Sequence, residues 1–392
     1  MTPNSPATLG GVVDAMERMY PVTWADDHDA VGLVTGHPDA TVARVLLAVD
    51  PVQAVVDQAV ALGADLIVVH HPLLLRPVSS VRADRPKGRV VHDLIRNGIG
   101  LYVAHTNADS PANGVSDSLA RALGLQSVRP LVAAQVDPLD KIVTFVPVDR
   151  VEDVTDVLAE AGAGALGDYD RCAFRVDGLG TFRPGPHATP TIGHPGRVEV
   201  VREARLEMVL PRRNRDLVVS ALRSAHPYEE PAFDVFELAG WASERGSGRL
   251  GRLPLPMRLA DFTEHVVATL PPTAVGARAA GDPDALVQSV AVAGGAGDFL
   301  LDEARSSGVD VYVTSDLRHH PASEFREHLG APALVDVPHW AAEWTWLPVL
   351  RDCLGGALLE RGWSVEVEVS RICTDPWNYR AAGRAPGGSG AP

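Results

Sequence analysis

The sequence predicts an α/β protein whose core carries a mixed sheet and is split in sequence by an inserted βαββαβ domain. Two observations carry this prediction. Short runs of β-branched residues alternate with amphipathic stretches from Val42 onward, and the same alternation returns beyond about Leu255. Such alternation is typical of helices packed on a parallel or mixed sheet. Between the two stretches the order of the elements changes, and segments rich in Gly and Pro stand on both sides.

The two halves of the core are expected to consist of strands and helices in turn. Residues 42–50 read VARVLLAVD, a buried strand, after which Pro51 suits the first turn of a helix and Gly63 suits its end. In the first half, further strands are expected at 65–70 and 100–105, and helices at 88–96 and 115–123. In the second half, strands are expected at 286–293, 309–313, 333–337 and 364–369, with helices between them.

The middle of the chain predicts a domain of its own. Its strands and helices are expected in the order βαββαβ at 141–147, 151–161, 173–182, 198–210, 214–223 and 232–238. This order is the ferredoxin-like split motif. The flanking segments LVAAQVDPLD and GWASERGSGRLGRLPLP are expected to be flexible linkers. The predicted division is therefore a first half of the core at 1–131, the insertion at 132–245, the second half at 246–375 and a disordered tail at 376–392.

Composition excludes several classes of function. Acidic residues outnumber basic ones by 50 to 35, a formal net charge of -15, so no nucleic-acid partner is expected. The three cysteines are odd in number and far apart, which argues against a disulfide framework and against a thiolate metal site. The N-terminal residues lack a basic stretch followed by an apolar one, and no run of 18 or more uncharged apolar residues occurs. We therefore expect no membrane partner and a cytoplasmic location.

Polar residues follow the predicted strands where ligands gather in open α/β sheets. His70 and His71 end one apolar strand, and His105 and Asp109 follow another. A histidine pair at this place favours metal ligation, because each buried ring has two nitrogens to satisfy. Asp109 can alternatively be the N-cap of the next helix. The glycine-rich segment VAGGAGDF, residues 292–299, is interpreted as a tight strand–helix turn, with an anion-binding turn as the alternative.

His339 and Glu343 are four residues apart on a predicted helix, so an imidazole and a carboxylate converge on one point. Alone this pair is a weak signal. The combined set offers nitrogen and oxygen ligands without thiolate, which suits zinc, manganese, iron or cobalt. The candidate ligands are His70, His71, Asp109, His339 and Glu343, with His105 nearby. One bridging carboxylate and several imidazoles predict two divalent cations per chain and a hydrolytic reaction.

Five segments carry a resemblance to a known family. They are DAVGLVTG (29–36), ADLIVVHHPLL (64–74), YVAHTNAD (102–109), DVYVTSDLRHH (310–320) and DVPHWAAE (336–343). In order and spacing the sequence resembles the Nif-three-like dinuclear-metal family, the GTP cyclohydrolase I type 2 homologs. The resemblance implies that the five candidate residues are metal ligands, and it places His105 and His320 near the site. It also implies a ring-shaped homohexamer whose metal sites face an internal cavity.

The predicted insertion is similar to the PII- or CutA-type domain of longer family members, through KIVTFVP (141–147) and HPYEEPAFDVFEL (226–238) among other segments. Within it, His226, Tyr228, Glu229 and Glu230 form a polar cluster that can bind a small ligand or a cation; a capped helix end entering an edge strand explains it equally well. Two hypotheses of function follow. The first is a hydrolase with a small-molecule substrate, in which Glu343 bridges two cations. The alternative is a non-catalytic regulatory protein that binds a metal or a metabolite.

Overall fold

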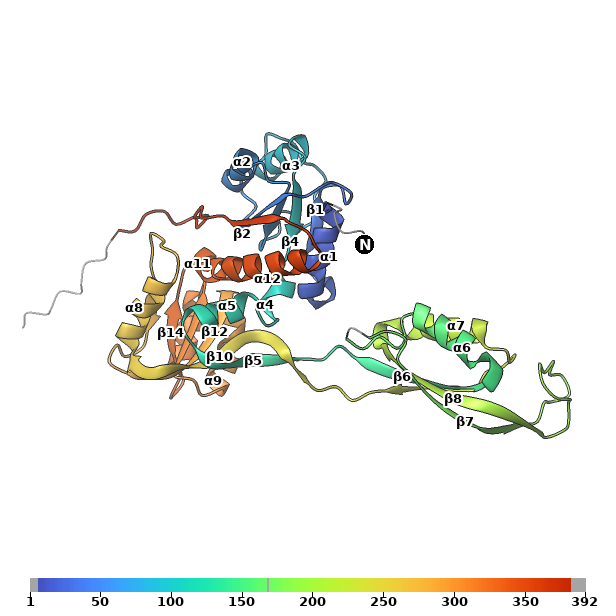
Figure 1. Ribbon diagram of the computed structural model, residues 1–392. Coiled ribbons are helices and arrows are strands. Elements are labelled where there is room, and N and C mark those ends of the chain that lie inside the picture. The colour runs from blue at the N-terminus through green and yellow to red at the C-terminus, as the bar shows by residue number, and fades with distance from the viewer. Residues whose placement is uncertain (1–5, 168, 382–392) are drawn as a thin grey trace, which may run out of the picture. The chain divides into compact units, whose positions relative to one another are not determined.

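The computed structural model describes residues 6–167 and 169–381, which separate into two compact units (Figure 1). One unit joins the chain up to Ala134 with the chain from Glu244 onward, and the other is Gln135–Ser243. The expected boundaries were at 131/132 and 245/246. Among the described residues, no helix is both long and apolar enough to cross a membrane.

The split unit contains two sheets rather than the single mixed sheet expected. The first has the strand order β1-β4-β3-β2-β15, in which β1 runs antiparallel to its neighbour β4 and the others pair in parallel. Its strands are β1 (Gly32–Thr35), β2 (Arg44–Ala48), β3 (Leu66–Val69), β4 (Gly100–Val103) and β15 (Glu366–Val369). Helices α2 (Gln53–Leu62) and α3 (Pro86–Arg96) pack on one face. On the other lie α1 (Leu9–Met19) and α12 (Trp346–Glu360).

The second sheet has the order β11-β14-β13-β12-β10-β5. Its strands are β5 (Gln126–Gln135), β10 (Ala242–Arg258), β11 (Arg278–Ala280), β12 (Leu286–Ala296), β13 (Val311–Ser315) and β14 (Ala333–Asp336). Its helices are α8 (Leu259–Thr269), α9 (Leu301–Ser306) and α10 (His319–Glu327). The halves exchange one strand each, because β5 joins the second sheet and β15 joins the first. This exchange is a contact between distant parts of the chain, which local patterns do not reveal.

A layer of helices lies between the two sheets of the split unit (Figure 1). It contains α4 (Thr106–Asp109), α5 (Val115–Ala122), α11 (His339–Trp344) and α12. A single hydrophobic cluster joins residues of both halves, from Leu9 and Val45 in the first to Val311 and Leu350 in the second. The expectation that both halves build one core is met in this sense. The layer also brings α11 from the second half beside the strand ends of the first.

The segments expected to be flexible linkers lie mostly in strands, so this prediction was wrong for most of their length. Residues 126–135 form β5 and residues 242–258 form β10. Their glycines stand where two backbones approach closely: a Cβ on Gly246 would lie 2.1 Å from the carbonyl oxygen of Val132, and one on Gly251 would lie 2.9 Å from Leu125. Glycine in a strand marks close backbone approach as often as flexibility, and composition alone does not separate the two.

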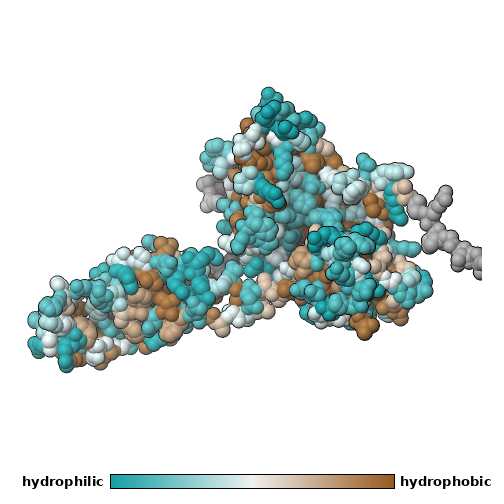
Figure 2. Space-filling model, turned by 180° about the vertical axis from the view of Figure 1, so that it is seen from behind, coloured by the Kyte–Doolittle hydropathy of each residue, from teal (hydrophilic) through white to brown (hydrophobic). Residues whose placement is uncertain are grey.

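The inserted unit consists of one four-stranded antiparallel sheet and two helices. The strand order is β7-β8-β6-β9, and every neighbouring pair is antiparallel. Along the chain the elements are β6 (Leu139–Pro147), α6 (Val151–Glu160), β7 (Ala173–Phe182), β8 (Glu199–Pro211), α7 (Arg215–Ala225) and β9 (Phe233–Glu237). Both helices pack on one face, over Ile142 and Leu206. Hydrophobic surface remains outside this core, as the brown patches in Figure 2 show; Phe174, Val176 and Phe236 are about half exposed or more.

The buried carboxylate of Asp140 ties β6 to the start of α7. It accepts hydrogen bonds from Nε of Arg212 at 2.9 Å and Nε of Arg215 at 2.6 Å. The bond from Arg215 is the main reason that the pKa of Asp140 lies below its usual value. Asp140→Asn is therefore expected to lower the free energy of unfolding of this unit by about 2 kcal/mol at pH 7, because the neutral amide offers one acceptor oxygen to two guanidinium groups and loses the charge-assisted hydrogen bonds.

The pH dependence of this effect has a definite sign. A carboxylate whose pKa is lowered on folding stabilises the protein above its unfolded pKa of about 3.9, and this stabilisation is lost as the pH falls through the lower folded pKa. The difference between the wild type and Asp140→Asn should thus shrink only below about pH 4. Urea denaturation at several pH values measures it. Glu237→Gln removes an exposed partner of the same arginines and should lower the free energy of unfolding by less than about 1 kcal/mol. Equal losses in the two variants would show that the burial of Asp140 adds nothing to its ion pairs.

Candidate metal centre

The ends of strands β3 and β4 and the helices α4 and α11 place the predicted site residues. His70 and His71 follow β3, while His105 follows β4 and precedes α4, whose last residue is Asp109. His339 and Glu343 lie on α11, which follows β14. The helix after Asp109 is α5, and its N-cap is Gly114. The alternative interpretation of Asp109 as an N-cap was therefore wrong.

Glu343 is the centre of the cluster. Its side chain is 4% exposed, and its Oε1 lies 2.7 Å from Nε2 of His339 and 3.4 Å from Nε2 of His70. Its Oε2 lies 3.0 Å from Nε2 of His71. On the far side of His70, Nε2 is 3.6 Å from Oδ1 of Asp109. Three residues predicted as ligands, His70, His71 and His339, thus surround the buried carboxylate of Glu343. The fifth, Asp109, lies beside His70, and the set comes from both halves of the chain.

The other ring nitrogen of each central histidine is held by an acceptor outside the cluster. Nδ1 of His70 donates to the carbonyl oxygen of Ala104 at 2.9 Å. Nδ1 of His71 pairs with Oδ1 of Asp50 at 2.7 Å, and Nδ1 of His339 with Oδ2 of Asp316 at 2.7 Å. Because ionised carboxylates and carbonyls only accept, Nδ1 carries the proton, and Nε2 of each neutral ring presents a lone pair inward. This is the orientation that metal-ligating histidines adopt.

The geometry of these lone pairs tests whether the cluster suits a cation. Nε2 of His71 and Nε2 of His339 lie only 3.2 Å apart, and both face the Glu343 carboxylate. Oε2 of Glu343 is buried and receives no well-aligned hydrogen bond from the described residues. Acceptors that face one another at these distances repel unless a proton or a metal ion lies between them. The nitrogen and oxygen donors, without thiolate, fit a divalent cation.

Without a metal ion, protons on the histidines supply the positive charge that separates the facing acceptors. Burial opposes the charging of His71, but the Glu343 carboxylate outweighs it, with help from Asp50, and raises the pKa of His71 to about 11. Burial and Glu343 compete in the same way at His339, whose pKa rises to about 9. Conversely, His71, His70 and His339 overcome the burial of Glu343 and hold its pKa well below the usual value. A cation entering the cluster must therefore displace protons, and its affinity should fall as the pH is lowered.

His105 lies at the rim of the cluster, whereas His320 does not. The His105 ring is 5.0 Å from that of His70 and 5.7 Å from that of His71, and the three rings are close enough to share an ion. Its Nδ1 lies 2.9 Å from Oδ1 of the buried Asp29. His320 is exposed on α10, and the ring that it contacts is that of His319. Among the described residues, no contact joins His320 to the cluster.

Three aspartates hold the histidines, and the sequence analysis assigned none of them a role. Asp50 follows β2, Asp316 follows β13, and Asp29 precedes β1. Each therefore stands beside a strand end, as the predicted ligands do, and this position was the available signal. Asp29 and Asp316 also fall in segments on which the family resemblance rests. No local sequence pattern indicates which histidine each aspartate contacts.

The glycine-rich segment at the end of β12 contacts the cluster directly. A Cβ on Gly295 would lie 2.6 Å from Oε1 of Glu343 and 3.4 Å from Nε2 of His339. The φ of Gly295 is +71°, in the left-handed region that favours glycine. The segment thus joins the end of β12 to the helical turn at Asp298–Leu300, as expected, and Gly295 within the strand makes room for the buried carboxylate.

Replacing Asp50 tests the acceptors that bind Nδ1 of the central histidines. Asp50→Ala is expected to weaken divalent-metal binding by about 10- to 100-fold, because His71 loses the acceptor that fixes its ring. Competition with a chromophoric chelator measures the affinity. The matched control is Thr374→Val, which removes the hydroxyl that bonds to Asp50 Oδ2 but leaves the carboxylate in place. A loss in Thr374→Val as large as in Asp50→Ala would assign the effect to the C-terminal segment instead.

A split α/β fold with a buried histidine–carboxylate cluster between its halves defines a candidate metal-binding protein. The family model described as Duf34/NIF3 (NGG1p interacting factor 3) matches residues 7–376. The chain belongs to this family, as the resemblance in the sequence indicated.

Named relatives and solved structures agree with this placement. A Mycobacterium tuberculosis protein called GTP cyclohydrolase 1 type 2 homolog is 50% identical over 378 residues, covering 94% of this chain and 96% of the relative. A Bacillus subtilis protein with the same name is 36% identical over 368 residues, covering 94% and 97%. The crystal structure of a Bacillus cereus protein related to NIF3 covers 96% of this chain and 100% of its own, with 35% identity and a TM-score of 0.76.

Proposed function

We propose that this protein is a hydrolase that uses two divalent cations per chain. His70, Asp109 and Glu343 would hold one cation, and His71, His339 and Glu343 the other. The observation that carries the proposal is the central carboxylate: three inward-facing imidazoles surround the two oxygens of Glu343. A second carboxylate, Asp109, lies beside His70. Zinc, manganese, iron and cobalt all suit such ligands.

The residues of the cluster have different roles in the proposed centre. Divalent cations in such a pair supply Lewis acidity and lower the pKa of bound water toward neutrality. Glu343 would contact both cations, because both of its oxygens face ligand nitrogens. Asp50, Asp316 and the carbonyl of Ala104 keep the three inner histidines in the tautomer that offers Nε2. His105, held by Asp29 at Nδ1, lies at the rim, next to His70 and His71.

The names of the relatives support a hydrolytic reaction and leave the substrate open. The Mycobacterium tuberculosis and Bacillus subtilis relatives are both called GTP cyclohydrolase 1 type 2 homolog. We expect a small-molecule substrate, and GTP is one compound to test. The expected assembly is a homohexamer, and light scattering of the purified protein measures it. The absence of a nucleic-acid partner and the cytoplasmic location stay predictions from the sequence.

A regulatory binding protein is the second candidate function. It is favoured by the inserted unit, whose element order and strand order β7-β8-β6-β9 support a ferredoxin-like assignment of the PII or CutA type. In that case the metal cluster would bind without turnover, and the inserted unit would respond to a small ligand.

One experiment separates the two functions. The protein is stripped with a chelator, reconstituted with zinc, manganese, iron or cobalt, and incubated with GTP and a panel of phosphate esters, amides and cyclic amidines. The hydrolase proposal predicts turnover that needs the metal and disappears in Glu343→Gln. Saturable calorimetric binding without consumption of any compound would favour the regulatory protein.

A further inference from the structure

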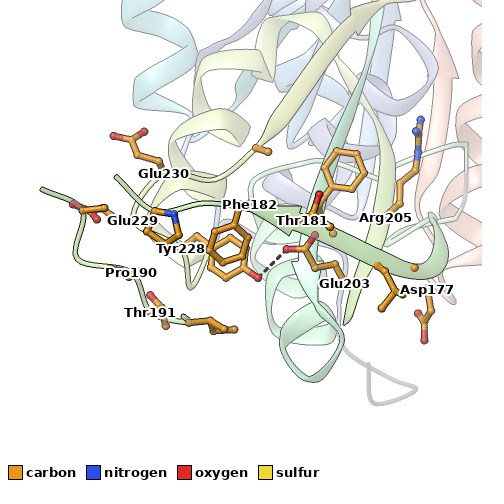
Figure 3. A pocket seen from close by; sticks show the side chains of 18 of the residues that line it. Asp177, Thr181, Phe182, Pro190, Thr191, Glu203, Arg205, Tyr228, Glu229 and Glu230 are labelled. Atoms are coloured by element: carbon orange, nitrogen blue, oxygen red, sulfur yellow. Dashed lines mark hydrogen bonds between the residues drawn. The ribbon is translucent and has the colours of Figure 1, made fainter. Parts of the chain in front are cut away.

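The inserted unit contains a cavity of about 550 Å³ that lies on the side of its sheet away from the helices. Strand pairing places Glu203 opposite Gly178, and Arg205 opposite both Val176 and Phe145. The alternate residues Ala204 and Leu206 are buried under the helices, so Glu203 and Arg205 face the other way. The turn after α7 and the segment after β7 form the walls (Figure 3). The volume is typical of pockets for small organic ligands.

Glu203 is the polar centre of this cavity. The residue is 9% exposed, and Oε1 accepts a hydrogen bond of 2.8 Å from the hydroxyl of Tyr228 (Figure 3). Its Oε2 lies against the backbone of Gly180, where a Cβ would come within 1.7 Å. Among the described residues, Glu203 has no cationic partner within 4 Å. Burying a carboxylate without a counter-charge is costly, so this site favours a ligand that carries positive charge.

The other charges around the cavity do not neutralise Glu203. Glu229 and Glu230 also line it, and neither forms an ion pair within the described part of the chain. The one basic residue of the lining, Arg205, pairs with Oε1 of Glu207 at 2.8 Å. In Figure 3 its guanidinium points away from Glu203. The cavity therefore keeps an excess of negative charge, which selects against anionic ligands.

His226 does not supply the missing charge either. Its Nε2 donates to the carbonyl oxygen of Phe145 at 3.0 Å, and its Nδ1 accepts from the backbone N–H of Tyr228 at 3.1 Å. Both nitrogens of a neutral ring are thereby satisfied, and burial lowers the pKa of His226. The role of His226 is to fix the turn that carries Tyr228, Glu229 and Glu230. His226 is the C-cap residue of α7, in agreement with the interpretation of this polar cluster as a capped helix end.

Aromatic rings supply the remaining recognition. Phe145, Phe182 and Tyr228 line the cavity, and the rings of Phe182 and Tyr228 lie 5.7 Å apart at 54°. Aromatic faces attract cations and bury apolar groups. Gly178 adds open space, because a Cβ there meets no atom within 4 Å.

We propose that this cavity binds a small organic cation, a protonated amine on an aromatic body, with its ammonium group paired to Glu203 and its ring against Phe182 and Tyr228. All of the lining residues belong to Gln135–Ser243, so the site is separate from the metal cluster. The proposal does not depend on the hydrolase activity.

Ligand-observed NMR on the full chain tests this assignment with tryptamine as the probe and indole-3-propionate as its anionic counterpart. Tryptamine should bind saturably and at least about tenfold more tightly than the acid, since a charged hydrogen bond contributes that much. Glu203→Gln, which keeps an acceptor for Tyr228, should weaken tryptamine binding by about tenfold or more. Gly178→Val should abolish binding by filling the cavity. Glu160→Gln, at the exposed end of α6, removes the same charge elsewhere and should leave binding unchanged.

Three results would overturn the proposal. They are no saturable binding of tryptamine to the wild type, equal binding of tryptamine and indole-3-propionate, and unchanged tryptamine binding in Glu203→Gln. If the wild type binds no probe and Gly178→Val dissociates an oligomer, the cavity is instead a contact between copies of the chain.

Discussion

Replacing Gly295 by alanine is expected to weaken divalent-metal binding by about 100-fold, the upper end of what a disturbed metal-ligand environment costs. The added methyl group would lie 2.6 Å from Oε1 of Glu343, so either the carboxylate or the β12 backbone must move. Since Glu343 contacts all three inner histidines, its displacement disturbs both halves of the proposed centre. Isothermal titration calorimetry of the chelator-stripped protein with zinc or manganese measures the loss of metal affinity.

Gly308→Ala is the matched control for this variant. Gly308 has a φ of +70°, almost the same as the +71° of Gly295, but a Cβ there meets no atom within 4 Å. Both variants pay the same backbone strain, so the difference between them isolates the contact with Glu343. If Gly295→Ala binds metal as Gly308→Ala does, Glu343 is not the centre of the site.

Arg249→Met is expected to lower the free energy of unfolding of the split unit by about 3–5 kcal/mol, the cost of breaking a buried charged network. Arg249 is 2% exposed. Its Nη1 donates to the carbonyl oxygens of Gly246 and Gly248, and its Nη2 to those of Ser110 and Pro111. Methionine fills a similar volume but donates nothing, which leaves four carbonyls without this partner.

The same variant is expected to weaken metal binding, because Ser110 and Pro111 directly follow Asp109 and Arg249 fixes that segment. Urea denaturation gives the stability, and metal titration at a low denaturant concentration gives the affinity. Arg252→Met is the control, since Arg252 is exposed on the same strand and donates to Gln288; its cost should stay below about 0.5 kcal/mol. Similar costs for the two variants would show that the buried hydrogen bonds of Arg249 contribute little.

Local patterns predicted the parts of the centre that local structure determines. The spacing of His339 and Glu343 placed both on one helix face, and the apolar run before His70 predicted a strand that ends there. These features depend on a few neighbouring residues. The pairing of His71 with Asp50, or of His339 with Asp316, depends on how distant strands are ordered, which the sequence pattern does not specify.

The fold was least predictable where distant segments pair. β5 and β10 contain the Gly, Pro and Ser residues that are typical of linkers, yet their backbones pair in one sheet. The exchange of β5 and β15 between the two sheets is likewise a long-range event. The cavity of the inserted unit could not be predicted for the same reason, because Phe145, Glu203 and Tyr228 come from separate elements. Of these, only Tyr228 belonged to the polar cluster that the sequence singled out.

The most direct test of the central claim is the metal content per chain, measured by elemental mass spectrometry on the wild type and on Glu343→Ala purified in parallel. Circular dichroism first establishes that both are folded. The proposed centre predicts about two divalent cations per wild-type chain and a large loss in the variant. No bound metal in the wild type after reconstitution with zinc, manganese, iron and cobalt, or the same content in both proteins, would contradict it.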